Sequence, residues 1–238
     1  MTRQSSHSNL LGAVACRLYA ILDDGQIKVR GLSFEEVAEG LLAASPSLLQ
    51  YRAKQVSREE ARACLALIME LRAELSPSTE IYMNDWPDLA SEVGADGVHV
   101  GQMDLSVSEV RARYPTLRVG LSTHSVADVE RALAASAIPD YLAIGPLAQT
   151  GSKENPDPIV SPGELTKVSA LVRARGIPLV GIGGLNAERG RAVSELVDFV
   201  AVIGALLEGT TGVETRARVL DNARTIEAAI AGDRSVRG

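Results

Sequence analysis

The sequence predicts a single closed (β/α)8 barrel, an α/β fold, and two observations support that prediction. Short apolar runs alternate along the chain with segments whose apolar residues recur every three or four positions. Such alternation requires parallel strands joined by helical crossovers, and a count of eight runs favours a closed barrel. The length of 238 residues suits one such domain. We expect the barrel over residues 16–230, with a flexible leader at 1–15 and a flexible tail at 231–238.

The predicted strands are the eight apolar runs. Their apolar residues are mostly Val, Ile, Leu and Ala, since the chain contains only two Phe and one Trp. The runs lie at residues 16–22, 47–52, 80–84, 97–100, 117–122, 141–145, 178–183 and 199–204.

The predicted helices fill the intervals between these strands. Ser33 is expected to cap the first of them, because Glu36 follows at the capping-box position. A short helical segment is expected after Asp85, and the interval at 187–196 has the weakest helical pattern. The other expected helices lie at 33–44, 57–75, 106–114, 125–136, 161–176 and 215–232.

Acids and glycines mark opposite ends of the even-numbered strands. An aspartate stands one to three residues before three of these strands, where we expect it to hydrogen-bond the turns of a structural rim. A glycine closes each of the same strands at the opposite rim, where a barrel of this kind builds its active site. The aspartates are Asp96, Asp140 and Asp198, and the glycines are Gly101, Gly145 and Gly204.

Composition narrows the class of protein. A net charge of −6 argues against a nucleic-acid-binding surface, and no apolar run reaches the roughly 18 residues of a membrane helix. The two cysteines, Cys16 and Cys64, are too few for a disulfide scaffold and indicate a reducing compartment. The run "LLGAVAC" is too short for a convincing export signal. We therefore expect a cytoplasmic protein that binds neither nucleic acid nor membrane; a homo-oligomer is compatible with the sequence.

Two neighbouring strands end in acidic residues. Asn84 and Asp85 end the third strand, and Gln102 and Asp104 follow the fourth. On adjacent strands these oxygen-bearing side chains would share one patch of the catalytic rim, which suits a hard cation such as Mg²⁺. The alternative is that Asp85 and Asp104 cap the helices that follow them.

The second strand ends in "QYRAK". Gln50, Arg52 and Lys54 alternate, so their side chains would share one side of the strand and could bind a phosphate or diphosphate. The alternative is that these are solvated charges at the rim.

Two later segments also favour an anion ligand. Thr150, Ser152 and Lys153 lie on a loop after the sixth strand that could fold over a ligand. The seventh strand ends in "GIGGLN" and the eighth in "AVIGALL", and the loops after these strands are the recurrent phosphate site of such barrels.

Several of these motifs, taken in order, resemble the thiamine-phosphate synthase family over roughly residues 17–228. They are "QYRAK", "NDWPDLA", "GADGVHVGQMDL", "GLSTHS", "IGPLAQTGSK" and "LVGIGGLN". The resemblance implies that the enzyme joins a hydroxymethylpyrimidine diphosphate to a hydroxyethylthiazole phosphate, giving thiamine monophosphate and pyrophosphate. It also implies a requirement for Mg²⁺ and a dissociative reaction with a pyrimidine-methyl cation.

The resemblance implies a role for each site residue. Asp85 and Asp104 would bind Mg²⁺, and Arg52, Lys54, Ser122 and Lys153 would take part in catalysis. The pyrimidine diphosphate would contact Gln50, Tyr51, Arg52, Ala53, Lys54, Asn84, Ser122 and Lys153, and the thiazole phosphate would contact Thr150, Gly151, Ser152, Gly184, Ile203 and Gly204.

Two positions depart from the family pattern, and two other functions remain open. Relatives usually carry Arg where this chain has Trp86, and Ser where it has Gly204. One alternative is an isomerase similar to thiazole tautomerase, with His124 as acid and base. The other is a non-catalytic phosphate-binding barrel. His99, on the fourth strand, is expected to be a hydrogen-bonded core residue rather than a metal ligand.

Overall fold

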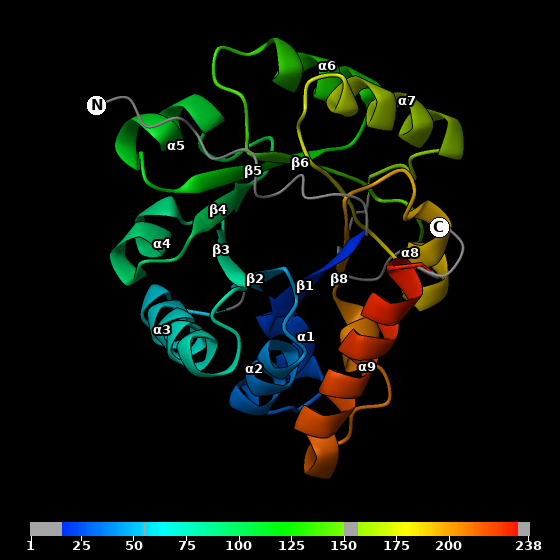
Figure 1. The fold of residues 1–238 in the computed structure, drawn as a ribbon. Coiled ribbons are helices and arrows are strands. Elements are labelled where there is room, and N and C mark those ends of the chain that lie inside the picture. Colours follow the sequence, from blue (N-terminus) through cyan, green and yellow to red (C-terminus); the bar gives the residue numbers. More distant parts are fainter. Residues whose placement is uncertain (1–15, 55, 150–156, 233–238) are drawn as a thin grey trace.

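A computed structural model describes residues 16–54, 56–149 and 157–232. Eight parallel strands pair in sequence order, and β8 pairs with β1 to close the barrel. Figure 1 shows the strands as an inner ring with the helices packed around it. This arrangement confirms the predicted fold class.

The strands begin and end within two residues of the predicted positions. They are β1 (Arg17–Asp23), β2 (Leu48–Arg52), β3 (Glu80–Asn84), β4 (Gly97–Val100), β5 (Arg118–Thr123), β6 (Tyr141–Ile144), β7 (Leu179–Gly181) and β8 (Phe199–Val202).

The helices also follow the predicted order, with one addition. Helix α1 (Asp24–Val29) directly follows β1 in a stretch for which no element was expected. The others are α2 (Phe34–Ala43), α3 (Arg58–Leu75), α4 (Pro87–Val93), α5 (Val107–Arg113), α6 (Val126–Ala134), α7 (Pro162–Arg173), α8 (Ala187–Val193) and α9 (Thr215–Ile230), with 3-10 turns η2 (Gly204–Leu207) and η3 (Gly212–Glu214).

The three aspartates of the structural rim act as expected. Each carboxylate accepts a hydrogen bond from a backbone N–H at the start of the preceding odd-numbered strand, and so ties neighbouring strands together. The bonds join Asp96 to Ile81 N (2.8 Å), Asp140 to Val119 N (2.7 Å) and Asp198 to Leu179 N (2.8 Å).

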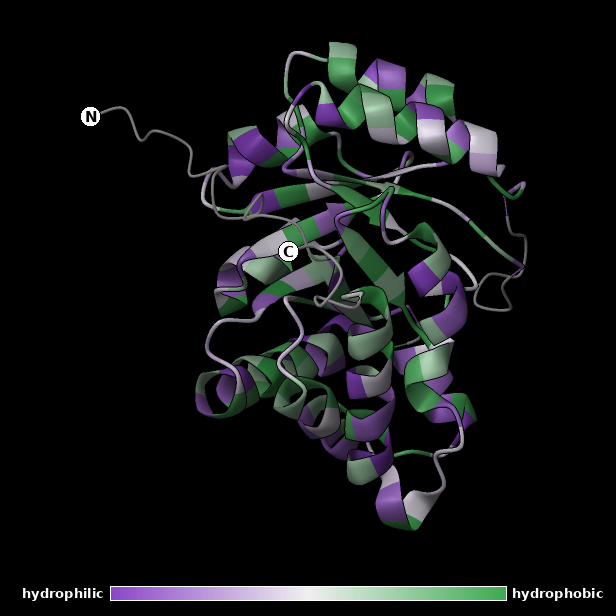
Figure 2. Cartoon of the chain, turned by 45° about the vertical axis from the view of Figure 1, so that its right-hand side comes forward, coloured by the Kyte–Doolittle hydropathy of each residue, from purple (hydrophilic) through white to green (hydrophobic). Residues whose placement is uncertain are grey.

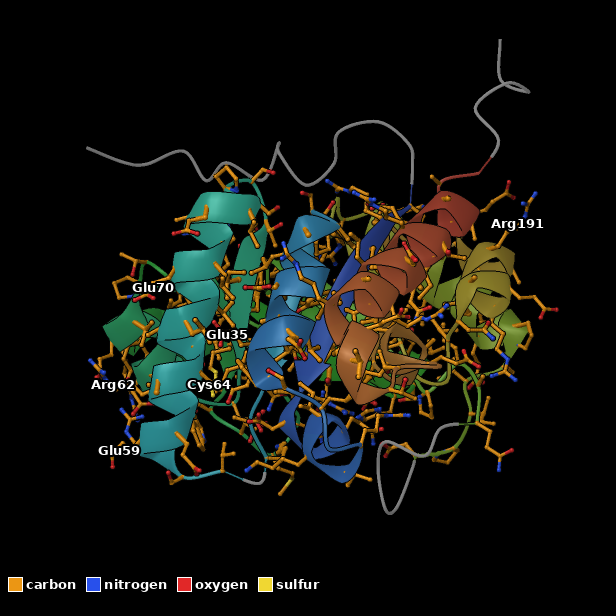
Figure 3. All side chains as sticks on the ribbon, turned by 90° about the horizontal axis from the view of Figure 1, so that it is seen from below. Glu35, Glu59, Arg62, Cys64, Glu70 and Arg191 are labelled. Atoms are coloured by element: carbon orange, nitrogen blue, oxygen red, sulfur yellow. The ribbon has the colours of Figure 1, made fainter. Side chains whose placement is uncertain are left out.

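Apolar side chains form two buried layers. One lies between the strands and the helices, and the other fills the barrel and includes Tyr19, Tyr82 and Tyr141. Figure 2 shows hydrophobic strands inside and hydrophilic residues on the outer faces of the helices. The charged side chains of Glu59, Arg62 and Glu70 project outward from α3 in Figure 3.

In the part of the chain that the structure describes, no helix combines the length and the apolar character needed to cross a membrane.

Candidate active site at the carboxyl rim of the barrel

A cavity of about 130 Å³ opens at the carboxyl ends of the strands. Predicted substrate-binding residues from β2, β3 and β5 meet in its wall, where His99 of β4 and His124 join them. These predicted residues are Gln50, Arg52, Asn84 and Ser122.

Strand alternation decides which side chains of β2 reach this cavity. Gln50 and Arg52 point into the barrel, because successive side chains of a strand face opposite sides. The Tyr51 side chain is fully buried on the outer side, and its hydroxyl donates to Asp24 Oδ2 at 2.7 Å. Ala53 is also buried in the outer layer. The side chains of Tyr51 and Ala53 therefore face away from the cavity, and contact of these two residues with the substrate stays a prediction that would involve their backbone.

The Arg52 guanidinium is held by an ion pair with Asp23. Asp23 is only 4% exposed, and its other oxygen accepts a hydrogen bond from Gln26 N (2.9 Å) at the start of α1. One carboxylate thus caps the helix and orients the arginine. The cation keeps a defined position at the cavity wall.

Asp85 and Asp104 lie together, as the positions of β3 and β4 predicted. Burial raises the pKa of the Asp104 carboxyl, and the neighbouring Asp85 adds to that rise. Lys54 forms an ion pair with Asp85, which places the ammonium beside the same patch. The backbone at Asp85 is left-handed, with φ of +65°, a conformation that is uncommon outside glycine and often marks a functional position.

The helix-capping alternative for the two acids is wrong. Helix α4 has Trp86 at its N-cap, without a side-chain capping bond. Helix α5 is capped by Ser106, which accepts from Glu109 N at 3.3 Å. Asp104 instead accepts a hydrogen bond from Gly101 N at 2.7 Å. Neither carboxylate caps a helix, and both lie at the carboxyl rim of the barrel.

The donor set at this patch fits Mg²⁺. The ion often binds through one or two carboxylates and completes its shell with water and substrate phosphate, and Asp85 and Asp104 would be the two carboxylates. Within the described residues no group of three or more His, Cys, Asp and Glu could hold a metal ion. Gln102, which follows β4, donates its amide N–H to Ser122 O (2.5 Å).

A second cavity of about 470 Å³ lies beside the first, at the ends of β7 and β8. Three of the residues predicted to hold the thiazole phosphate line it, and Ile182, Gly183, Ala201 and Ile203 belong to the walls of both cavities. Gly184 has φ of +67°, and a Cβ there would lie 2.3 Å from Gln149 O. The turn after β7 therefore needs glycine at this position. The three predicted residues are Gly184, Ile203 and Gly204.

Six polar residues that line the second cavity were not predicted from the sequence: Gln26, Arg30, Gln149, Asn186, Arg189 and Glu208. Gln26 of α1 and Arg30, the C-cap residue after this helix, line the cavity, and Arg189 of α8 donates to Gly184 O at 2.8 Å. Asp23 followed three residues later by Gln26 has the pattern of a helix start, and this signal could have revealed α1. Nothing in the sequence alone shows that Arg189 turns toward the cavity.

His124 lies at the edge of the first cavity. Its Nδ1 is 2.7 Å from Gly145 O and 3.6 Å from an Asp157 oxygen. A carbonyl oxygen only accepts hydrogen bonds, so Nδ1 carries the proton that Gly145 O accepts. The other ring nitrogen, Nε2, is not engaged by this bond. Thr150, Gly151, Ser152 and Lys153 lie outside the described residues.

A family model described as thiamine monophosphate synthase matches residues 18–206. The chain belongs to this family. A thiamine-phosphate synthase of Koribacter versatilis is 42% identical over 195 residues, which cover 80% of this chain and 89% of the relative. One from Methanospirillum hungatei is 34% identical, over 81% of this chain and 90% of the relative.

Solved structures agree with the fold. A thiamine phosphate pyrophosphorylase from Pyrococcus furiosus has a TM-score of 0.72 and 26% identity, covering 90% of this chain and 96% of the other. A tryptophan synthase of Mycobacterium tuberculosis has a TM-score of 0.66 at 12% identity, which is a likeness of fold alone.

Proposed function

We propose that this chain is a thiamine-phosphate synthase. It couples 4-amino-2-methyl-5-hydroxymethylpyrimidine diphosphate to a hydroxyethylthiazole phosphate and releases pyrophosphate. The observation that carries the proposal is the pair of cavities with a shared wall in a chain of this family. One cavity has the cation and amides suited to the pyrimidine diphosphate, and the other has the glycine loops suited to the thiazole phosphate.

The diphosphate end of the first substrate is assigned to Arg52, Lys54 and Lys153. The C–O bond breaks with its electron pair leaving on the diphosphate, so negative charge grows on the group that these cations are proposed to bind. Mg²⁺ held by Asp85 and Asp104 would neutralise part of that charge. Lys54 is well placed for both roles because its ammonium pairs with Asp85.

The protein contributes orientation and exclusion of water rather than a covalent bond. The thiazole nitrogen attacks the pyrimidine-methyl carbon, and the shared wall of the cavities allows the two substrates to meet. No protein nucleophile is required. Burial raises the pKa of the Cys16 thiol to about 12, which keeps it protonated and unreactive at neutral pH.

The chain is assigned to the cytoplasm on its cysteine usage, and its ligands are small phosphorylated molecules. Mg²⁺ is assigned as the cofactor, bound by the two carboxylates of the rim together with the diphosphate. The family match and the pairing of Asp85 with Asp104 support this assignment.

An assay of pyrophosphate release tests the function. The purified chain should release pyrophosphate only when both substrates and Mg²⁺ are present, and omission of any one should stop it. Conversion of a thiazole phosphate isomer without the pyrimidine would support the isomerase instead. Binding of both ligands without turnover would support the non-catalytic barrel.

A further inference from the structure

A chain of four hydrogen bonds crosses the barrel at the first cavity. It begins at the Gln50 amide, whose Nε2 donates to the Tyr19 hydroxyl at 2.8 Å. The Tyr19 and Tyr141 hydroxyls are 2.7 Å apart, and the Tyr141 hydroxyl is 2.8 Å from His99 Nδ1. His99 Nε2 is 2.8 Å from Ser122 Oγ, where the chain ends. It therefore links two predicted substrate-binding residues, Gln50 and Ser122.

The barrel makes room for this chain with a glycine. Gly120 of β5 pairs with Tyr141 of β6, and a Cβ at Gly120 would lie 2.0 Å from the Tyr141 ring. Tyr141 and Tyr19 are each 1% exposed and packed edge to face, with ring centroids 5.8 Å apart. Burial raises the pKa of both phenols, so each keeps its proton.

The first bond sets the direction of all the others. Gln50 Nε2 can only donate, so the Tyr19 oxygen accepts from it. The Tyr19 proton then goes to the Tyr141 oxygen, because the described residues offer this buried hydroxyl no other acceptor. The Tyr141 proton is then left for His99 Nδ1. An imidazole that accepts at Nδ1 while neutral carries its proton at Nε2, and this proton goes to Ser122 Oγ.

We propose that this hydrogen-bond chain fixes His99 as the neutral Nε2–H tautomer and thereby sets the donor and acceptor polarity of the cavity. Tyr19, Tyr141 and His99 are positioning residues in this account. With its lone pair engaged by His99, the Ser122 hydroxyl presents its proton as a donor. The Gln50 carbonyl oxygen makes no hydrogen bond within the described residues and presents an acceptor.

This polarity complements an aminopyrimidine. The exocyclic amino group of such a ring is a donor suited to the Gln50 oxygen, and its ring nitrogens are acceptors suited to the Ser122 hydroxyl. A 4-oxopyrimidine reverses the pattern, with a carbonyl in place of the amino group and an N–H in the ring. The specificity rests on the proposed function, whereas the tautomer is a property of the substrate-free protein.

Nitrogen-15 NMR of the substrate-free protein at neutral pH tests the tautomer directly. We expect a pyridine-like shift for His99 Nδ1 and a pyrrole-like shift for Nε2, assigned by loss of these signals in His99→Asn. A protonated Nδ1 in the wild-type protein would overturn the proposal, whatever the enzyme's activity.

Three variants test the route. Tyr141→Phe removes the donor to His99 Nδ1 and should give a mixture of His99 tautomers. Tyr19→Phe removes the hydroxyl one bond earlier in the chain and should change the nitrogen-15 shifts of His99 by a smaller amount. Tyr82→Phe is the matched control, because Tyr82 is a fully buried barrel tyrosine whose hydroxyl bonds to Glu80 instead. A wild-type His99 spectrum in both Tyr141→Phe and Tyr19→Phe would contradict the route.

Substrate preference supplies the second measurement. In Tyr141→Phe, the ratio of kcat/KM for the 4-amino substrate to that for its 4-oxo analogue should fall by about two- to tenfold, as expected from loss of one oriented hydrogen bond. Tyr82→Phe should keep the wild-type ratio. If the wild-type protein, Tyr141→Phe and Tyr82→Phe all had the same ratio of kcat/KM values, the link to substrate specificity would be overturned. That result would leave the coupling reaction itself unchallenged.

Discussion

Asp85 combines a costly backbone conformation with a carboxylate at the substrate rim. Its φ of +65° is tolerated by asparagine and aspartate better than by most residues with a side chain. The conformation follows the end of β3 directly, where Asp85 N donates to His99 O at 2.9 Å. The strain therefore has a local cause, which is the turn that aims this carboxylate toward Asp104 and Lys54.

Asp85→Asn should keep the fold and lower kcat by at least about a hundredfold, the scale seen when one group that stabilises developing charge is lost. Asparagine suits the left-handed backbone, so the variant removes charge rather than structure. Asp88→Asn is the matched control, since Asp88 is an exposed acid one turn further on that pairs with Arg58. If Asp85→Asn had the same kcat as the wild-type protein at saturating Mg²⁺, Asp85 would not be a ligand of the metal.

Asp104 should make stability depend on pH. Its pKa is raised above 3.8 in the folded protein, so the folded state binds the proton more tightly than the unfolded chain does. The free energy of unfolding should therefore fall as the pH rises from the unfolded pKa through the folded one. Asp104→Asn should lose less stability over this range when urea unfolding is measured without divalent cations. A steeper loss in the variant would reverse the sign and contradict this account.

At the level of elements, the loops after β7 and β8 form the wall of the second cavity. The two glycines there differ. Gly184 is left-handed and a Cβ would meet Gln149 O at 2.3 Å, whereas nothing lies within 4 Å of a Cβ built at Gly204. A side chain can therefore be added after β8 but not after β7. The family pattern already suggested room at Gly204, where relatives usually carry Ser, but the lack of room at Gly184 depends on the approach of Gln149, which no local pattern gives.

The Gly204→Ser variant should bind the thiazole phosphate at least as tightly as the wild-type protein does. The new hydroxyl can donate a hydrogen bond to the charged phosphate, and such a bond contributes about 1.5–3 kcal/mol at best. Gly184→Ala should instead lower stability, because alanine fits neither the backbone nor the space. Titration calorimetry and thermal unfolding of the two variants check these outcomes. Loss of thiazole phosphate binding in a folded Gly204→Ser would mean that the pocket is shaped for another ligand.

Helix α1 is the element that the sequence prediction lacked. It occupies six residues directly after β1 and carries Gln26 into the second cavity. Six residues give too few apolar repeats for a helical period to stand out, so only the Asp23 cap could have signalled it. The long α3 was predicted because its apolar repeat is a local pattern. The structure adds a Ser57–Glu60 capping box at its start.

For the whole molecule, the sequence predicted what local patterns determine. The strands, the aspartates of the structural rim and the meeting of Asp85 with Asp104 follow from strand order in a barrel. The contact of Tyr19 with Tyr141 joins residues 122 positions apart and depends on the register of several strands, which no local pattern gives. The same holds for the outward burial of Tyr51 against Asp24.

The yield of thiamine phosphate per pyrophosphate released tests the central claim most directly. Mass spectrometry of the products, with both substrates and Mg²⁺ present, should give equal amounts of the two, because one bond formed at the thiazole nitrogen accompanies each diphosphate lost. Removal of the thiazole phosphate should stop thiamine phosphate formation. Pyrophosphate released without thiamine phosphate, in the presence of both substrates, would contradict the assignment of this chain as a synthase.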